Sequence, residues 1–321
     1  MIEVLTSGML NSVQDLGRAG YLDVGVSTGG VMDTLALRLG NALLGNEPGA
    51  AAIEVALFPF RLCFHRPAEF AVTGADCAAT LDGIAMPPCW SRSAAAGQVL
   101  ALSPPRRGAR AYVCVRGGLD VPIALGSRST DQKNGFGGLD GRGLMRGDRL
   151  PVLGAHPRNA PGLGAWLAEL DYLPGTEPAT PLRVVPAAQA HALAPEMTNL
   201  FYGADWSLPP DANRMGFRFS GPALQLMGPM ELFSHGIVPG TIQLPRSGQP
   251  LIQLADANTC GGYPKLATVI EADLWRLAQA PVGGKVRFVQ VTRDAGIEAL
   301  REQFRQIEGV VRQAARLHAA A

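Results

Sequence analysis

Short apolar runs separated by turn residues make up much of the chain. Examples are the segments 70–72, 112–115, 251–254 and 286–291, which are rich in Val, Ile, Leu and aromatic residues. The chain's 39 glycines and 25 prolines punctuate such runs, and both residue types favour turns. Short apolar segments between turn residues are typical of β-strands. The pattern therefore predicts a mainly β protein with a few short helices.

One early segment has the features of a helix instead. Between residues 34 and 44, leucines recur at every fourth position, which places them on one helical face. Asp33 precedes this segment and is suited to accept hydrogen bonds from the free N–H groups of the first turn. Gly45 follows it and can adopt the left-handed conformation that ends many helices. We therefore predict a helix over 34–44.

The last segment predicts a second helix. Apolar residues between 296 and 317 are spaced by three and four positions, with Glu and Arg between them. This pattern indicates an amphipathic helix that packs on the body of the protein. Upstream, the stretch from about 153 to 195 is rich in Pro, Ala and Gly, so we place a domain boundary there. The expected halves are 1–175 and 176–321, the second with the terminal helix, and interleaving of the halves remains open.

Composition narrows the class of protein. With 321 residues and 47% hydrophobic content the chain can build a substantial core. The 28 basic and 27 acidic residues nearly balance and form no block of like charge, so we expect no nucleic-acid partner. The amino terminus lacks an export signal and no apolar stretch is long enough to span a membrane. Five cysteines without a C-x-x-C pair fit a reducing cytoplasm, so we expect cytoplasmic localisation and no membrane partner.

Several common motifs are missing from the sequence. The glycine-rich segment 135–140 lacks the third glycine of a dinucleotide fingerprint, and no Walker A sequence occurs. The segment 126–130 lacks the closing glycine of a nucleophile elbow. The five histidines show no zinc-ligand spacing. None of the three lysines is flanked by methionines, so we expect no covalently attached biotin.

A first cluster of polar and glycine residues spans 12–20. It brings Gln14, Asp15 and Arg18 close together in sequence, and Asp33 follows after a second glycine-rich stretch. Glycines at this density let backbone approach a ligand or another backbone segment. Two interpretations stay open here: a ligand site, and a tight turn held by an Asp15–Arg18 ion pair.

A second cluster spans 213–218 and contains Arg214 and Arg218. Two guanidinium groups beside a turn are suited to bidentate binding of a carboxylate or a phosphate. The alternative is a surface strand whose arginines are solvated.

A third cluster spans 231–263 and mixes polar side chains with apolar strand residues. Buried polar groups are unfavourable unless they are paired or form a site. Histidine titrates near neutrality, which makes His235 a candidate acid or base, although a structural role is the alternative. Cys260 is either a nucleophile or a small packed side chain. The polar residues that we single out are Glu231, Ser234, His235, Gln243, Asp256, Thr259 and Tyr263.

These clusters together resemble the KipA family, also described as the biotin-dependent carboxyltransferase or urea-amidolyase-related family. The similar motifs occur in the family's order at 13–20, 32–33, 137–151 and 213–264. Within that family, the segments 234–236 and 278–288 favour the branch formed by the C subunits of 5-oxoprolinase (PxpC). The chain departs from the family pattern at 29–33, where a serine is missing, and at Cys260, which replaces a threonine.

The resemblance implies cyclophilin-like β-barrels, as two related units, and a heteromeric enzyme. The implied reaction is ATP-dependent cleavage of 5-oxo-L-proline to L-glutamate together with the A and B subunits, of which the KipI-like B subunit is the direct partner. ATP, with Mg²⁺, would act in the complex, and no metal ligands are assigned. Two other functions stay open: biotin-dependent carboxyl transfer to urea or a related amide, and regulation by antagonising a KipI-like kinase inhibitor.

Residue roles follow from the motifs that resemble the family. Acidic groups would serve a metal or activate water, and His235 would act as acid or base. Arginines would hold a phosphate or the substrate carboxylate, and neutral groups would orient the substrate. The predicted catalytic residues are Asp33, Glu231, His235 and Asp256. The predicted substrate-binding residues are Gln14, Arg18, Arg214, Arg218, Gln243, Thr259 and Tyr263.

Overall fold

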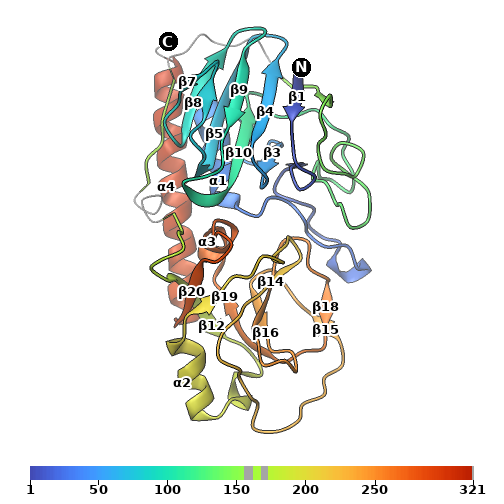
Figure 1. Cartoon of the computed structure of the whole chain (residues 1–321), viewed down its shortest axis with the longest axis vertical. Coiled ribbons are helices and arrows are strands. Elements are labelled where there is room, and N and C mark those ends of the chain that lie inside the picture. The colour runs from blue at the N-terminus through green and yellow to red at the C-terminus, as the bar shows by residue number, and fades with distance from the viewer. Residues whose placement is uncertain (155–161, 168–172, 320–321) are drawn as a thin grey trace. The chain divides into compact units, whose positions relative to one another are not determined.

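The computed structural model describes residues 1–154, 162–167 and 173–319 (Figure 1). It divides into two compact units that alternate along the chain. The proline- and glycine-rich stretch expected around 153–195 lies partly outside the described residues. Unit 1 takes its residues from Met1–Arg18, Gly29–Leu173 and Phe304–Ala321, and unit 2 from Ala19–Thr28 and Pro174–Gln303.

The described strands of unit 1 form two antiparallel sheets (Figure 1). One sheet has the order β11-β1-β4-β9-β6-β7 and the other β2-β3-β10-β5-β8. The strands of the first sheet are β1 (Ile2–Thr6), β4 (Phe60–Phe64), β6 (Thr80–Leu81), β7 (Ile84–Ala85), β9 (Val99–Leu102) and β11 (Arg149–Leu150). Those of the second are β2 (Ser12–Gln14), β3 (Ala52–Val55), β5 (Ala68–Asp76), β8 (Trp90–Ala94) and β10 (Arg107–Val115).

Side chains of both sheets form one hydrophobic core in unit 1. Ile2 and Phe60 come from the first sheet and Phe70 and Val113 from the second, and all four are fully buried in this core. Full burial of such a side chain stabilises the fold by about 1.5–3 kcal/mol. The apolar runs predicted at 70–72 and 112–115 thus lie in core strands.

Helix α1 (Thr34–Leu44) has the bounds that the sequence predicts. The Asp33 carboxylate accepts a hydrogen bond from the Ala36 N–H at 2.8 Å, and Gly45 is left-handed with φ 68°. The helix packs on β5 and β10. Gly40 permits this close approach, because a Cβ there would lie 2.5 Å from the Cys114 sulfur.

Unit 2 is built on one mixed sheet of the order β13-β20-β12-β19-β16-β17-β14, with a separate β15-β18 pair. Only β12 and β20 pair in parallel among the described strands of this sheet. The strands are β12 (Thr180–Pro186), β13 (Trp206–Ser207), β14 (Gly216–Arg218), β15 (His235–Gly236), β16 (Thr241–Gln243), β17 (Leu251–Gln253), β18 (Cys260–Gly261), β19 (Lys265–Val269) and β20 (Lys285–Gln290). The helices are η1 (Leu22–Val24), η3 (Ala190–Ala192), α2 (Pro195–Gly203), η4 (Glu271–Asp273) and α3 (Leu274–Ala278).

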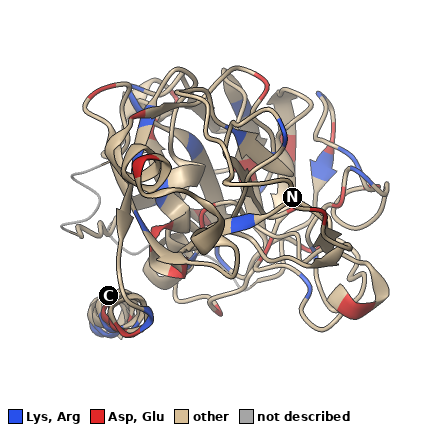
Figure 2. Cartoon of the chain, turned by 90° about the horizontal axis from the view of Figure 1, so that it is seen from below, with Lys and Arg blue, Asp and Glu red and all other residues tan. Residues whose placement is uncertain are grey.

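The terminal helix α4 (Arg293–Ala319) is longer than the predicted 296–317. It begins earlier because the Thr292 hydroxyl accepts a hydrogen bond from the Ala295 N–H at 3.2 Å, which caps the first turn. Within unit 1, Arg38 of α1 lies over the Phe304 ring and the His318 ring contacts the Leu43 carbonyl. Both acidic and basic residues lie on the surface of α4, the helix at the C-terminus in Figure 2.

The mainly β class with a few short helices and a terminal helix, expected from the sequence, is confirmed. None of the described helices combines the length and the apolar character needed to cross a bilayer.

Candidate functional site

Strand register in unit 2 aligns a row of polar side chains on one sheet face. Arg218 of β14 and Gln243 of β16 both lie opposite Leu251 of β17, and Gly216 lies opposite Gln253. Because neighbours in register share a face and side chains alternate along a strand, these five positions face the same side. The intervening residues Phe217, Ile242 and Ile252 are buried on the opposite face.

This polar face is the floor of a cavity of ≈ 390 Å³, large enough for a small polar molecule. Strand β18 and the residues before it complete the wall. The residues that line it are Asp211, Asn213, Met215, Gly216, Arg218, Ile237, Gln243, Leu251, Gln253, Asn258, Cys260, Gly261, Gly262 and Tyr263. Three predicted substrate-binding residues, Arg218, Gln243 and Tyr263, therefore meet in one cavity.

Gln243, which lines this cavity, has a buried donor without a partner among the described residues. The side chain is 1% exposed, and its Oε1 accepts a hydrogen bond from Gln253 Nε2 at 2.7 Å. Among the described residues its Nε2 has no partner. A Cβ at Gly261 would lie 2.9 Å from that Nε2, so a larger residue at this position would crowd the amide. Leaving a buried donor unpaired costs about 1–3 kcal/mol, which a ligand acceptor can offset.

The two predicted anion-binding arginines differ in their surroundings. Arg214 pairs with Asp256 through Nε at 2.8 Å and Nη2 at 3.0 Å, and both side chains are largely buried. Arg218 is exposed, and no acidic side chain of the described residues lies within ion-pair distance of it. The charge of Arg218 is thus available to a ligand, whereas the charge of Arg214 is neutralised by its ion pair with Asp256.

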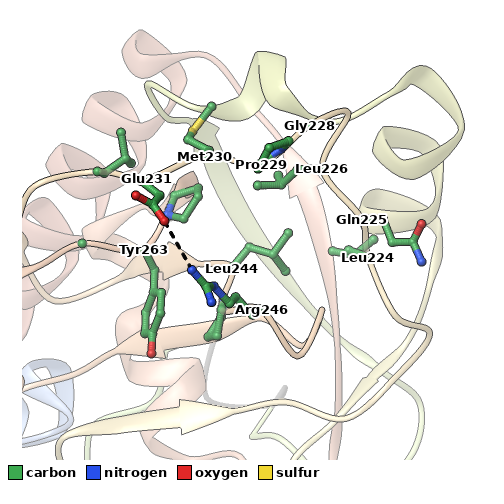
Figure 3. A pocket seen from close by; sticks show the side chains of 14 residues that line it. Leu224, Gln225, Leu226, Gly228, Pro229, Met230, Glu231, Leu244, Arg246 and Tyr263 are labelled. Atoms are coloured by element: carbon green, nitrogen blue, oxygen red, sulfur yellow. Dashed lines mark ion pairs between the residues drawn. The ribbon is translucent and has the colours of Figure 1, made fainter.

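A larger, more apolar cavity of ≈ 860 Å³ adjoins the first and shares Gly262 and Tyr263 with it. Figure 3 shows Leu224, Leu226, Met230 and Leu244 on its walls. The predicted catalytic Glu231 lies here, where its carboxylate is 3.6 Å from Arg246. Both partners are about 90% exposed, so this pair contributes little to stability.

The remaining predicted residues of unit 2 lie beside the smaller cavity without lining it. His235 pairs with Gly261 across β15 and β18, and its Nδ1 is 2.8 Å from the Phe233 carbonyl. A neutral ring that donates from Nδ1 keeps Nε2 as an acceptor. Thr259 contributes its carbonyl, which accepts the Ile237 N–H at 3.0 Å. Their catalytic and binding roles stay predictions.

In unit 1, Asp33 is 2% exposed and caps α1, as described above. Its backbone N–H donates to the Tyr112 hydroxyl at 2.9 Å, and that hydroxyl in turn donates to the buried Glu54 carboxylate at 2.8 Å. Burial, then the neighbouring Glu54 and Asp33, raise the pKa of Tyr112 well above its ordinary value, so the phenol stays protonated. These contacts give Asp33 a structural function, and its catalytic role stays a prediction.

The Asp15–Arg18 ion pair considered for the first cluster does not form. Asp15 accepts hydrogen bonds from the Ser127 and Ser129 hydroxyls and from the N–H groups of Gly17 and Arg128. Three of these four donors lie more than a hundred residues away in sequence. Ser127 and Ser129 belong to the segment 126–130, which lacks the closing glycine of a nucleophile elbow. Their buried hydroxyls donate hydrogen bonds to Asp15 instead.

Sequence reasoning missed Gln253, Asn213 and Asn258 as cavity residues. Gln253 was detectable, because the Leu-Ile-Gln and Thr-Ile-Gln triplets that end at Gln253 and Gln243 alternate apolar and polar positions with the period of a strand. Asn213 and Asn258 fall within the second and third clusters, but no strand period singles them out, since both lie outside the strands.

Metal ligation was left unassigned from the sequence. Within the ranges that the structure describes, no three His, Cys, Asp or Glu side chains are grouped so that they could hold a metal ion. Mg²⁺ is often held by only one or two carboxylates together with substrate phosphates, so its ligands stay unassigned.

Thiol reactivity provides a direct test of this cavity. Cys260 is exposed on its wall, whereas burial raises the pKa of Cys77 and of Cys89 to about 12. Since the thiolate is the reactive form, the two buried thiols stay protonated at the pH of the experiment below. We expect iodoacetamide at pH 8 to label Cys260 first, as peptide mapping would show. Faster labelling of Cys77 or Cys89 would contradict the assigned burial.

Fold and cavity together define a mainly β protein with a polar cavity over one sheet of unit 2. The chain belongs to the family "Carboxyltransferase domain, subdomain A and B", whose model matches residues 24–290.

Two relatives of similar length are named as the C subunit of 5-oxoprolinase. The chain is 39% identical over 308 residues to that of Escherichia coli, covering 96% of this chain and 97% of the relative. It is 40% identical over 296 residues to that of Haemophilus influenzae, covering 91% and 92%. The crystal structure of K. lactis urea amidolyase is similar with a TM-score of 0.86 and 28% identity, over 96% of this chain but 20% of that much longer one.

Proposed function

We propose that this chain is the C subunit of an ATP-dependent 5-oxoprolinase, which opens 5-oxo-L-proline to L-glutamate together with the A and B subunits. The observation that carries the proposal is the 39–40% identity, over nearly the whole length, to two proteins named as the C subunit of 5-oxoprolinase. The polar cavity of unit 2 supports it, because its donors fit a small molecule that has both an amide carbonyl and a carboxylate.

Ring opening requires water to add to the lactam carbonyl carbon. The bond from that carbon to the ring nitrogen then breaks, and the nitrogen takes up a proton as the amine of glutamate. A lactam is a stabilised amide, so ATP hydrolysis in the complex would supply the driving force. Transfer of the γ-phosphoryl group to the carbonyl oxygen would release ADP before water adds. Ring opening would then give an acyl phosphate of glutamate, which a second water would hydrolyse to L-glutamate and phosphate. ATP enters the proposal as a co-substrate of the complex, and this chain carries no Walker A sequence.

The geometry supports a substrate-binding role for two residues. The unpartnered Nε2 of Gln243 would donate to the oxygen that water adds to the lactam carbon, where negative charge develops as the proton leaves. The unpaired guanidinium of Arg218, on the same sheet face, would hold the carboxylate. Gln253 orients the Gln243 amide through the hydrogen bond at 2.7 Å, so Gln253 is a positioning residue.

A second candidate function is carboxyl transfer from biotin to urea or a related amide. It is favoured by the similarity to K. lactis urea amidolyase, at a TM-score of 0.86, and by the description of the matching family. An amide-binding cavity with a free donor would serve urea as well as a lactam. The two functions differ in their co-substrates, so an assay can separate them.

Reconstitution tests the proposal. The chain would be combined with the A and B subunits from its own organism, and glutamate formation from 5-oxo-L-proline and ATP would be measured with each component omitted in turn. We expect activity that requires all three proteins and ATP. Undiminished glutamate formation without this chain would contradict the proposal, and carboxylation of urea by carboxybiotin in its place would establish the second function.

A further inference from the structure

Leu251 is the apolar residue in the middle of the polar row on the floor of the smaller cavity. It lies on β17, with Arg218 of β14 opposite it on one side and Gln243 of β16 opposite it on the other. Neighbouring strands are about 4.8 Å apart, so the backbones of the two polar residues lie about 10 Å apart with Leu251 between them. All three residues line the cavity. A ligand that contacts both polar side chains therefore lies across Leu251.

The Leu251 side chain is partly exposed, and its position is set by a glycine on the neighbouring strand. A Cβ added at Gly216 of β14 would lie 3.3 Å from Leu251 Cδ1 and 2.8 Å from the Ile252 carbonyl oxygen. Glycine at this position therefore leaves the space that the leucine side chain occupies. Because Leu251 lines the cavity without being fully buried, part of its apolar surface is available for contact with a ligand.

Two other predicted substrate-binding residues, Gln14 and Arg18, lie in unit 1 and line neither of the two cavities described above. Both are almost fully buried. Gln14 Nε2 donates to the Thr130 carbonyl at 3.1 Å, and Arg18 Nη2 donates to the Ser129 carbonyl at 2.6 Å. These hydrogen bonds hold segments of unit 1 together, and the binding role of both residues stays a prediction.

The shape of 5-oxo-L-proline matches an apolar residue between two polar ones. Its ring nitrogen lies between the carbon that bears the carboxylate and the carbonyl carbon, and two methylenes close the ring. With the carboxylate at Arg218 and the carbonyl carbon at Gln243, the ring lies over Leu251. Urea has neither methylenes nor a carboxylate, so it makes no comparable contact with the leucine. The polar groups of the cavity alone do not make this distinction.

We propose that Leu251 determines substrate specificity in the smaller cavity, by packing against the ring methylenes of a five-membered lactam carboxylate. The proposal rests on the proposed function for the identity of that substrate. It adds the residue that selects the size of the ring. A hydrophobic contact of this kind discriminates between substrates that differ by one methylene by about 10- to 200-fold in kcat/KM.

A pair of lactams that differ by one methylene tests this role in the reconstituted complex. The substrates are 5-oxo-L-proline and its six-membered homologue 6-oxopiperidine-2-carboxylate, and their ring-opened products are glutamate and 2-aminoadipate. We expect the unaltered complex to prefer the five-membered lactam by at least about 10-fold in kcat/KM. The Leu251→Val variant removes one methylene from the cavity floor and suits a strand. It should lower the preference about 10-fold, because the larger ring gains the space that the smaller one no longer fills.

Leu226→Val is the matched control, since Leu226 is a partly buried leucine that lines only the larger cavity. Its ratio of the two kcat/KM values should equal that of the unaltered complex. The ratio is insensitive to a loss of folded protein, because such a loss lowers both rates by the same factor. An unaltered complex without preference, or a ratio that Leu251→Val changes by less than about twofold, would overturn the proposal.

The outcomes separate this inference from the proposed function. Failure to open either lactam would contradict the proposed function, and turnover of urea in their place would overturn both. Lactam turnover with a ratio independent of Leu251 would overturn this inference alone. Crystals of the unaltered complex with 5-oxo-L-proline give a test that needs no variant. The ring methylenes should lie within about 4.5 Å of the Leu251 side chain, and a ring bound away from it would contradict the assignment.

Discussion

The Gln243→Leu variant is expected to lose about 10²-fold in kcat for ATP-dependent glutamate formation by the reconstituted complex, because one preorganised donor to a developing oxyanion is removed. Leucine is close in volume to glutamine and fills the same buried place. It also removes the unpaired Nε2, which offsets part of what is lost when Gln253 loses its acceptor. The melting temperature should therefore change little while turnover falls.

Steady-state kinetics at saturating ATP, with 5-oxo-L-proline varied, would measure this effect. Gln225→Leu is the matched control, since Gln225 is exposed and lines only the larger, apolar cavity. If Gln243→Leu retained kcat within about threefold of the unaltered chain, the smaller cavity would not be the site that polarises the lactam. A rise in KM with unchanged kcat would assign Gln243 to substrate binding alone.

The Asp15→Ala variant is expected to lower the free energy of unfolding by at least about 4 kcal/mol, because four donors would lose a buried charged acceptor worth about 1.5–3 kcal/mol each, with incomplete additivity. The donors are two serine hydroxyls and the N–H groups of Gly17 and Arg128. The hydrogen bonds from Ser127, Arg128 and Ser129 connect the segment 127–129 to Asp15, which directly follows β2. The same hydrogen bonds hold the Ser129 carbonyl that orients Arg18.

Urea denaturation of the full chain would measure this loss. Asp120→Ala is the matched control, because Asp120 is a half-exposed carboxylate that pairs with Arg128 at 3.4 Å, and such pairs contribute about 0–1 kcal/mol. A loss near 1 kcal/mol for Asp15→Ala would show that solvent or other groups satisfy the four donors in its absence. Equal losses in the two variants would contradict the assigned network.

Local sequence patterns were sufficient to predict those helices and strands whose capping residues or apolar spacing lie within the element itself. Helix α1 has the predicted bounds, since the capping aspartate, the leucine repeat and the closing glycine all act within one short segment. Helix α4 was predicted too short, because its apolar repeat starts at Ile297 whereas the Thr292 cap begins the helix earlier. The predicted strands at 251–254 and 286–291 correspond to β17 and β20 within a residue at either end.

The candidate site was predicted less completely. Sequence motifs identified Arg218, Gln243 and Tyr263 as candidate binding residues, and in the structure all three line one cavity. The same motifs did not distinguish Arg218 from Arg214, although one faces the cavity without a counterion and the other is paired with Asp256. The two arginines are four residues apart, and what separates them is a carboxylate 42 residues away in sequence.

By itself, the sequence determined the mainly β class, the capped helix, the family and the short list of polar residues worth testing, because periodicity, capping and ordered motifs are local properties of a chain. Only the tertiary structure decided which polar groups are satisfied and which remain free. Asp15, Arg18 and Gln14 all find hydrogen-bond partners more than a hundred residues away, and strand register brings Gln243 beside Gln253. Such hydrogen bonds depend on how segments distant in sequence pack together, and a local sequence pattern does not predict them.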